Sequence, residues 1–94
     1  NEPEYDEQTI AEKWLYLVLS YIYDNRSNYE NALLKVEEVY ADFGYPKNIE
    51  SFVGYMPCSD ESYDPSEHTE QENRLRLYRL WKEYLDKEAI KYPL

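Results

Sequence analysis

The 94-residue sequence has only two glycines and one cysteine. So little glycine leaves few places for hairpin turns or phosphate-binding loops, which argues against an all-β fold and against a nucleotide site. A single cysteine cannot form an internal disulfide, so a reducing cytoplasm is the simplest compartment. The longest uncharged run, residues 14–23, is well below the roughly 18 residues that a membrane-spanning helix needs. No membrane span is expected.

Positive charge is also scarce. Lys and Arg together number 10 against 20 Asp and Glu, which gives a net charge of −10. This balance repels nucleic acid and anionic lipid, and it favours a basic protein partner or plain solubility. With 43% hydrophobic residues and 12 tyrosines, the chain has enough apolar surface to fold as a single domain over residues 1–94. The absence of an initiator methionine leaves open that this domain is the C-terminal part of a longer protein.

Apolar residues recur at spacings of three and four in four stretches, which predicts four amphipathic helices. The expected ranges are Glu7 to Asp24, Tyr29 to Phe43, Lys47 to about Tyr55, and from just after Thr69 to about Ile90. Gly44 is suited to end the second helix, and Thr69 with Glu72 forms a capping box before the last. We therefore predict an all-α fold, a compact four-helix bundle with a short third helix, buried around Trp14 and Trp81.

Catalytic chemistry has little support. A nucleophilic cysteine needs a thiolate and usually a histidine base, so Cys58 and His68 are the pair to consider. They lie ten residues apart across an acidic Ser/Asp/Pro-rich loop. Because neither a cation nor a helix N-terminus is expected near Cys58, we predict no enzyme activity and no cofactor. A carboxylate enzyme stays as a minor alternative, since 20 acids supply many pairs.

The same loop has part of a calcium-binding pattern. Asp60, Ser62 and Asp64 show the spacing that opens an EF-hand loop. The pattern then breaks, because Pro65 stands at the position that requires glycine and Gln71 at the position that requires a bidentate glutamate. We predict no metal site, with weak calcium binding as an alternative.

The expected second helix has an acidic outer face. At 100° per residue its carboxylates fall on the half of the helix opposite Val36, and Leu34 projects from the middle of that half. An isolated exposed leucine on a solvated acidic face is ordinary. The functional alternative is an apolar anchor with an acidic surround, which would fit a basic protein partner.

The order of these features resembles the immunity proteins of nuclease-type E colicins and pyocins. The residues that carry the likeness are Tyr45-Pro46, Tyr55-Met56-Pro57, the loop 59–66 and Trp81. In that family the second helix and a third helix with two tyrosines clamp a basic nuclease domain outside its catalytic centre. The resemblance places Leu33, Glu37 and Tyr40 on the specificity-determining helix and Tyr55 on the first family tyrosine. Met56 departs from the second.

A closer likeness in wording concerns residues 37–46 (EEVYADFGYP) and 52–57 (FVGYMP). These segments resemble the C-terminal part of the uncharacterised bacterial family DUF2247. Some members of that family are thought to neighbour polymorphic toxins. Both resemblances imply toxin neutralisation.

We therefore predict a cytoplasmic, non-enzymatic immunity protein that binds and neutralises a basic toxin domain, a nuclease under the first resemblance. Nucleic acid and membranes are not expected partners. The candidate contact residues, which combine acidic steering groups with apolar or aromatic anchors, are Glu30, Leu33, Leu34, Glu37, Glu38, Tyr40, Asp42, Tyr55, Asp60, Glu61 and Asp64. The alternative is a structural or oligomerisation module, in which a second copy or a further domain covers the first helix, which is apolar on every face.

Overall fold

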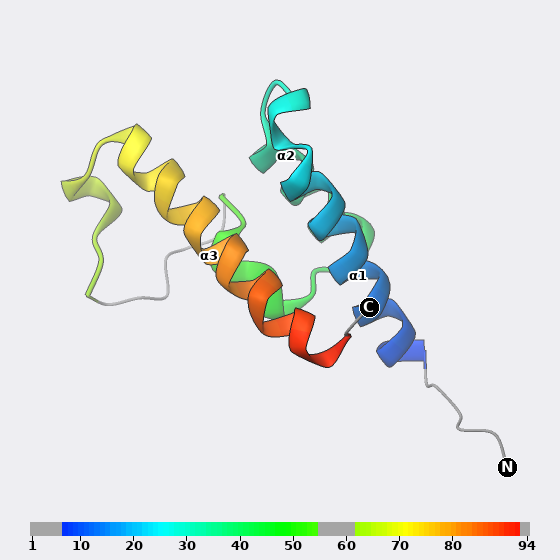
Figure 1. Ribbon diagram of the computed structural model, residues 1–94. Helices are drawn as coiled ribbons and strands as arrows, with labels where there is room; N and C mark the ends of the chain where they lie inside the picture. The colour runs from blue at the N-terminus through cyan, green and yellow to red at the C-terminus, as the bar shows by residue number, and fades with distance from the viewer. Residues whose placement is uncertain (1–6, 55–61, 93–94) are drawn as a thin grey trace, which may run out of the picture.

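The computed structural model describes residues 7–54 and 62–92 (Figure 1). Within these ranges it contains three α-helices and three short 3₁₀ helices, and no strand. The α-helices are α1 (Glu7–Asp24), α2 (Ala32–Asp42) and α3 (Glu70–Lys91), and the 3₁₀ helices are η1 (Arg26–Asn28), η2 (Lys47–Phe52) and η3 (Pro65–Glu67). The predicted all-α class is confirmed, with α1 at its expected bounds.

The second helix starts three residues later than expected, because Asn31 is its N-cap. The Asn31 side chain accepts a hydrogen bond from the backbone N–H of Leu33 at 3.1 Å. That bond satisfies one of the donors left without an intrahelical partner at a helix start. Tyr29 therefore precedes α2 and packs against the core from outside the helix.

The end of α2 at Gly44 is confirmed, and it is a Schellman motif. Gly44 has φ 78° and Tyr45 has φ 62°. The Gly44 N–H donates to the Ala41 carbonyl at 3.2 Å and the Tyr45 N–H to the Tyr40 carbonyl at 2.8 Å. The Tyr45 ring packs edge-on against Tyr40 at a centroid distance of 5.3 Å. This contact is the apolar closure that accompanies such a reversal, and it turns the chain toward η2.

The predicted short third helix is a 3₁₀ helix rather than an α-helix. Its residues Ile49 and Phe52, with Val53 at its C-cap, are fully or almost fully buried. It lies against α3, where Phe52 stacks on Trp81 at 6.2 Å and Tyr23 from α1 meets Trp81 edge-on at 5.0 Å. Trp81 is therefore the centre of the contacts between α1, η2 and α3. Met56, expected on the same short helix, lies outside the described residues.

The prediction that Trp14 lies in the core is wrong. Trp14 is 58% exposed, and Ile10 and Tyr21 lie on the same outward side of α1. Leu15 and Leu19 face inward instead. Because α1 is apolar around its whole circumference, its sequence offers two candidate inner faces. The stripe of aliphatic side chains packs against α2 and α3, and the indole remains at the surface.

A charged side chain is buried near the end of α3. Glu88 is 7% exposed, whereas the apolar Ala89 beside it is exposed. Glu88 continues the inward spacing of Trp81, Tyr84 and Leu85. Its carboxylate oxygen Oε2 lies 3.2 Å from the Lys91 Nζ, which compensates the buried charge.

The predicted capping box at the start of α3 is confirmed. The Thr69 hydroxyl accepts from the Glu72 N–H at 3.1 Å, and a Glu72 carboxylate oxygen accepts from the Thr69 N–H at 2.8 Å. The preceding segment folds back on α3, because Tyr63 stacks on His68 and donates its hydroxyl hydrogen to Asn73 Oδ1. The first half of α3 thus extends beyond the core as a defined helix (Figure 1).

The capping box has a testable pH dependence. Hydrogen bonds from the Thr69 backbone N–H and then from its side chain lower the pKa of Glu72 below the ordinary 4.5. A carboxylate with a lowered folded-state pKa stabilises fully above its unfolded pKa, and that contribution is lost as pH falls through the folded pKa. The difference in unfolding free energy between wild type and Glu72→Gln, measured by urea titration, should therefore shrink from pH about 6 to about 3. A constant difference would contradict the capping role.

The two tryptophans provide a second test. In a Trp81→Phe variant the remaining Trp14 should emit at long wavelength and be quenched readily by acrylamide, because it is 58% exposed. In a Trp14→Phe variant the remaining Trp81, which is 0% exposed, should emit at short wavelength and resist quenching. Only Trp81→Phe should lower stability measurably, since it alters the core. Equal quenching of the two variants would contradict the orientation of α1.

Candidate functional site

The acidic side chains that the sequence singles out lie on the outer face of α2 and in the two residues before its N-cap. Glu30, Glu38 and Asp42 are exposed, and Glu37 is half-buried. Leu34 is 53% exposed on the same face, although it is a large apolar side chain. The carboxylates thus surround an apolar side chain that is open to contact.

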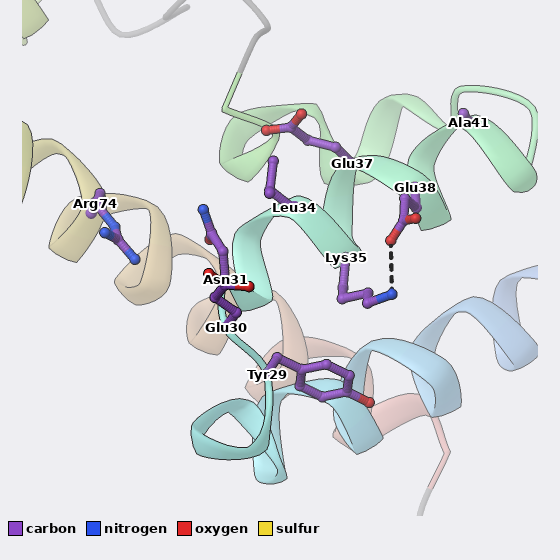
Figure 2. Close-up of a pocket in the computed structure, with 9 residues that line it drawn as sticks. All are labelled: Tyr29, Glu30, Asn31, Leu34, Lys35, Glu37, Glu38, Ala41 and Arg74. Carbon is purple, nitrogen blue, oxygen red and sulfur yellow. Dashed lines mark ion pairs between the residues drawn. The ribbon is translucent and has the colours of Figure 1, made fainter.

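An open groove of about 960 Å³ lies along this face. Figure 2 shows its lining, which comes from α2, from the two residues and N-cap before it, and from α3 on the other side. The lining residues are Tyr29, Glu30, Asn31, Leu34, Lys35, Glu37, Glu38, Ala41 and Arg74. The groove therefore combines an exposed leucine and a small Ala41 with charges of both signs.

The charges in this groove are only partly paired. Lys35 Nζ lies 3.2 Å from Glu38 Oε2, and both side chains are about half exposed or more. Within residues 7–54 and 62–92, neither Glu30, Glu37 nor Arg74 makes an ion pair or a hydrogen bond through its side chain. An exposed pair such as Lys35–Glu38 contributes little to stability. The remaining charges are available to an incoming group.

Glu37 is placed by Gly54, which follows η2 in the chain. A Cβ added to Gly54 would come within 3.1 Å of Glu37 Oε2, which is tighter than ordinary van der Waals contact. The missing side chain at Gly54 therefore lets the Glu37 carboxylate lie against the backbone. This contact explains why Glu37 is less exposed than the neighbouring Glu38.

Two predicted contact residues must be corrected. Leu33 is 6% and Tyr40 3% exposed, so both belong to the core. They lie seven residues apart on the inner face of α2, where helical periodicity directs them away from Leu34. The Tyr40 hydroxyl donates to Glu50 Oε2 at 3.1 Å, which satisfies the polar end of the ring. Neither side chain is displayed to a partner.

The predicted acidic rim is only partly described. Tyr55, Asp60 and Glu61 lie outside the described residues. Asp64 is the N-cap of η3, and its Oδ1 accepts hydrogen bonds from the Ser66 hydroxyl at 2.7 Å and the Ser66 N–H at 3.0 Å. These bonds lower the pKa of Asp64. Asp64 does not line the α2 groove, because η3 lies by the start of α3 (Figure 1).

The described residues also bear on catalysis, metals and membranes. His68 stacks on Tyr63 at 4.3 Å, with its Nδ1 3.7 Å from Glu72, while Cys58 lies outside the described residues. Among residues 7–54 and 62–92, no three His, Cys, Asp or Glu side chains are grouped as metal ligands would be. No helix in this part of the chain has the length and apolar character to span a membrane.

The predicted contact residues did not include Tyr29, Asn31, Lys35, Ala41 or Arg74 of this groove. Of these, Arg74 comes from a different helix, α3. It follows the acidic residues 1–73, which carry 17 acids and 4 bases, and opens the last segment with 3 acids and 6 bases. That change of sign was visible in the sequence. Its position opposite α2 was not, because it depends on how α3 packs on η2.

Comparisons with known proteins give one match. Neither curated protein sequences nor solved structures match the chain. A family model matches residues 1–89, nearly the whole chain. The chain therefore belongs to the family described as "Uncharacterized protein conserved in bacteria (DUF2247)".

Proposed function

We propose that this chain is an immunity-type protein that binds and neutralises a basic toxin domain in the cytoplasm. The observation that carries the proposal is the 53% exposed Leu34 in a groove whose carboxylates come from Glu30, Glu37 and Glu38. An apolar contact at the centre with a polar, solvent-accessible rim around it is the usual anatomy of a specific protein interface. The net charge of −10 adds long-range attraction toward a basic partner.

Two kinds of side chain in the groove contribute to binding in different ways. The exposed carboxylates accelerate association and select the sign of the partner's charge, but each gives little affinity on its own. Leu34 and Ala41 give the partner an apolar contact that excludes water. Such a face needs no chemistry of its own, because occupying a toxin surface is sufficient to block the toxin.

A second candidate function is an oligomerisation module. It is favoured by Ile10, Trp14 and Tyr21, which leave one side of α1 exposed at 45%, 58% and 64%. Sedimentation of the chain separates the two candidates. A firm dimer that buries the α2 face would favour the module, whereas a monomer, or a dimer that leaves this face open, agrees with toxin binding.

The protein encoded immediately upstream of this chain provides a test. We expect it to be a large secreted protein with a basic C-terminal domain. That domain should arrest growth when it is expressed in a bacterial host, and co-expression of this chain should restore growth. The absence of such a neighbour, or growth arrest that this chain does not relieve, would contradict the proposal.

Charge reversal tests the acidic face. A Glu37→Lys, Glu38→Lys variant should lose growth rescue and bind the toxin domain at least about a hundredfold more weakly, because like charges placed across an interface cost several kcal/mol. Binding is measured by titration calorimetry. A Glu67→Lys, Glu83→Lys variant changes the net charge equally at exposed sites outside the groove, so it should keep rescue. If both variants lose rescue and affinity equally, the effect comes from net charge alone and not from the α2 face.

Truncation of the anchor tests the apolar part. Leu34→Ala should weaken binding about tenfold or more, as expected of a central anchor. Its unfolding free energy should change by less than about 0.5 kcal/mol, because the side chain is half exposed. Leu75, which is 60% exposed on α3 and outside the groove, is the matched control. If Leu34→Ala and Leu75→Ala bind alike, Leu34 is not an anchor.

A further inference from the structure

We infer that the segment of the partner that enters the groove between α2 and α3 carries charges of both signs. It places basic side chains against Glu30 and Glu37, an apolar side chain on Leu34, and an acidic side chain against Arg74. This inference rests on the proposed function and names the element that the groove recognises. Arg74 thereby becomes the residue that distinguishes one basic partner from another.

Arg74 and Lys87 make no ion pair among the described residues of α3, whereas three other cations of this helix do. Arg79 lies 3.6 Å from Glu83, Lys82 lies 2.6 Å from Asp86 and Lys91 lies 3.2 Å from Glu88. Arg74 makes no such ion pair among the described residues, although Glu70 lies one helical turn before it. A Glu placed four residues before a basic residue is the favourable order for a helical pair. Arg74 instead lines the groove that faces α2.

The second observation concerns the cation on the opposite wall. Lys35 is the only basic residue of α2, and it is engaged by Glu38 at 3.2 Å. The charged side chains of the groove that make no ion pair among the described residues are therefore Glu30, Glu37 and Arg74. Figure 2 shows Arg74 approaching from α3, separate from the carboxylates of α2.

A uniformly basic segment would not complement this wall. It would pair with Glu30 and Glu37 but would place a like charge beside Arg74, and such juxtapositions are a common means of rejecting wrong partners. A segment with one acid at that position satisfies all three charges. The groove therefore specifies a pattern of charge as well as a sign.

This inference predicts an effect opposite to simple electrostatics. Arg74→Glu makes the groove more acidic, so attraction alone would strengthen the binding of any basic segment. If Arg74 pairs with an acid of the partner, the same change weakens binding, by about tenfold. Arg79→Glu alters the net charge equally, and Arg79 does not line this groove.

The experiment uses short random peptides displayed on phage and selected for binding to the folded wild-type chain. We expect the selected peptides to share basic residues, an apolar residue and one acid. The dissociation constant of one synthesised peptide is then measured with wild type, Arg74→Glu, Arg79→Glu and the Glu37→Lys, Glu38→Lys variant. A second peptide, in which Lys replaces the acid, is measured with the same four proteins.

The inference is supported if Arg74→Glu weakens the first peptide about tenfold and the Lys-substituted peptide recovers that loss on Arg74→Glu. It is overturned if the selected peptides lack an acid, or if Arg74→Glu strengthens binding as Arg79→Glu does. The proposed function then still stands, provided that Glu37→Lys, Glu38→Lys abolishes binding. Selection that yields no peptide, or only peptides indifferent to that double variant, overturns both.

Discussion

The stacking of Trp81 on Phe52 holds α3 against η2, and the groove between α2 and α3 depends on this contact. The two rings lie 6.2 Å apart and nearly parallel, and both are fully excluded from solvent. Because α3 is fixed there, its first half is directed past α2, and Arg74 comes to line the groove with the α2 carboxylates. Loosening this contact would separate the two walls without altering any residue of the groove.

The burial of one face of α2 determines which of its residues are exposed on the other face. Leu33, Val36 and Tyr40 fill the inner face, so helical periodicity directs Leu34 and Glu38 outward. The Schellman turn at Gly44 then reverses the chain toward η2. The Glu37 carboxylate lies close to Gly54, which follows η2 in the chain. The core thus orients the acidic face through the backbone, and the acids themselves contribute little to stability.

Local signals in the sequence predicted much of the fold. Thr69 with Glu72 and the glycine after α2 predicted helix ends correctly, because caps depend on residues only a few positions apart. The prediction that Trp14 is buried was wrong because α1 is apolar on every side, and only tertiary packing selects its inner face. Leu33 and Tyr40 were assigned to a partner by resemblance, whereas helical geometry places them in the core. Arg74 could not be foreseen, since its position depends on a contact between distant segments.

The central claim is that the carboxylates around Leu34 guide a basic protein to this face. The most direct test is the association rate of the chain with the basic toxin domain that the proposal expects to be encoded beside it, measured by stopped flow over a range of salt concentrations. Attraction between exposed charges is screened by salt, so the rate should fall steeply as salt rises while dissociation changes little. An association rate that does not depend on salt would contradict the claim.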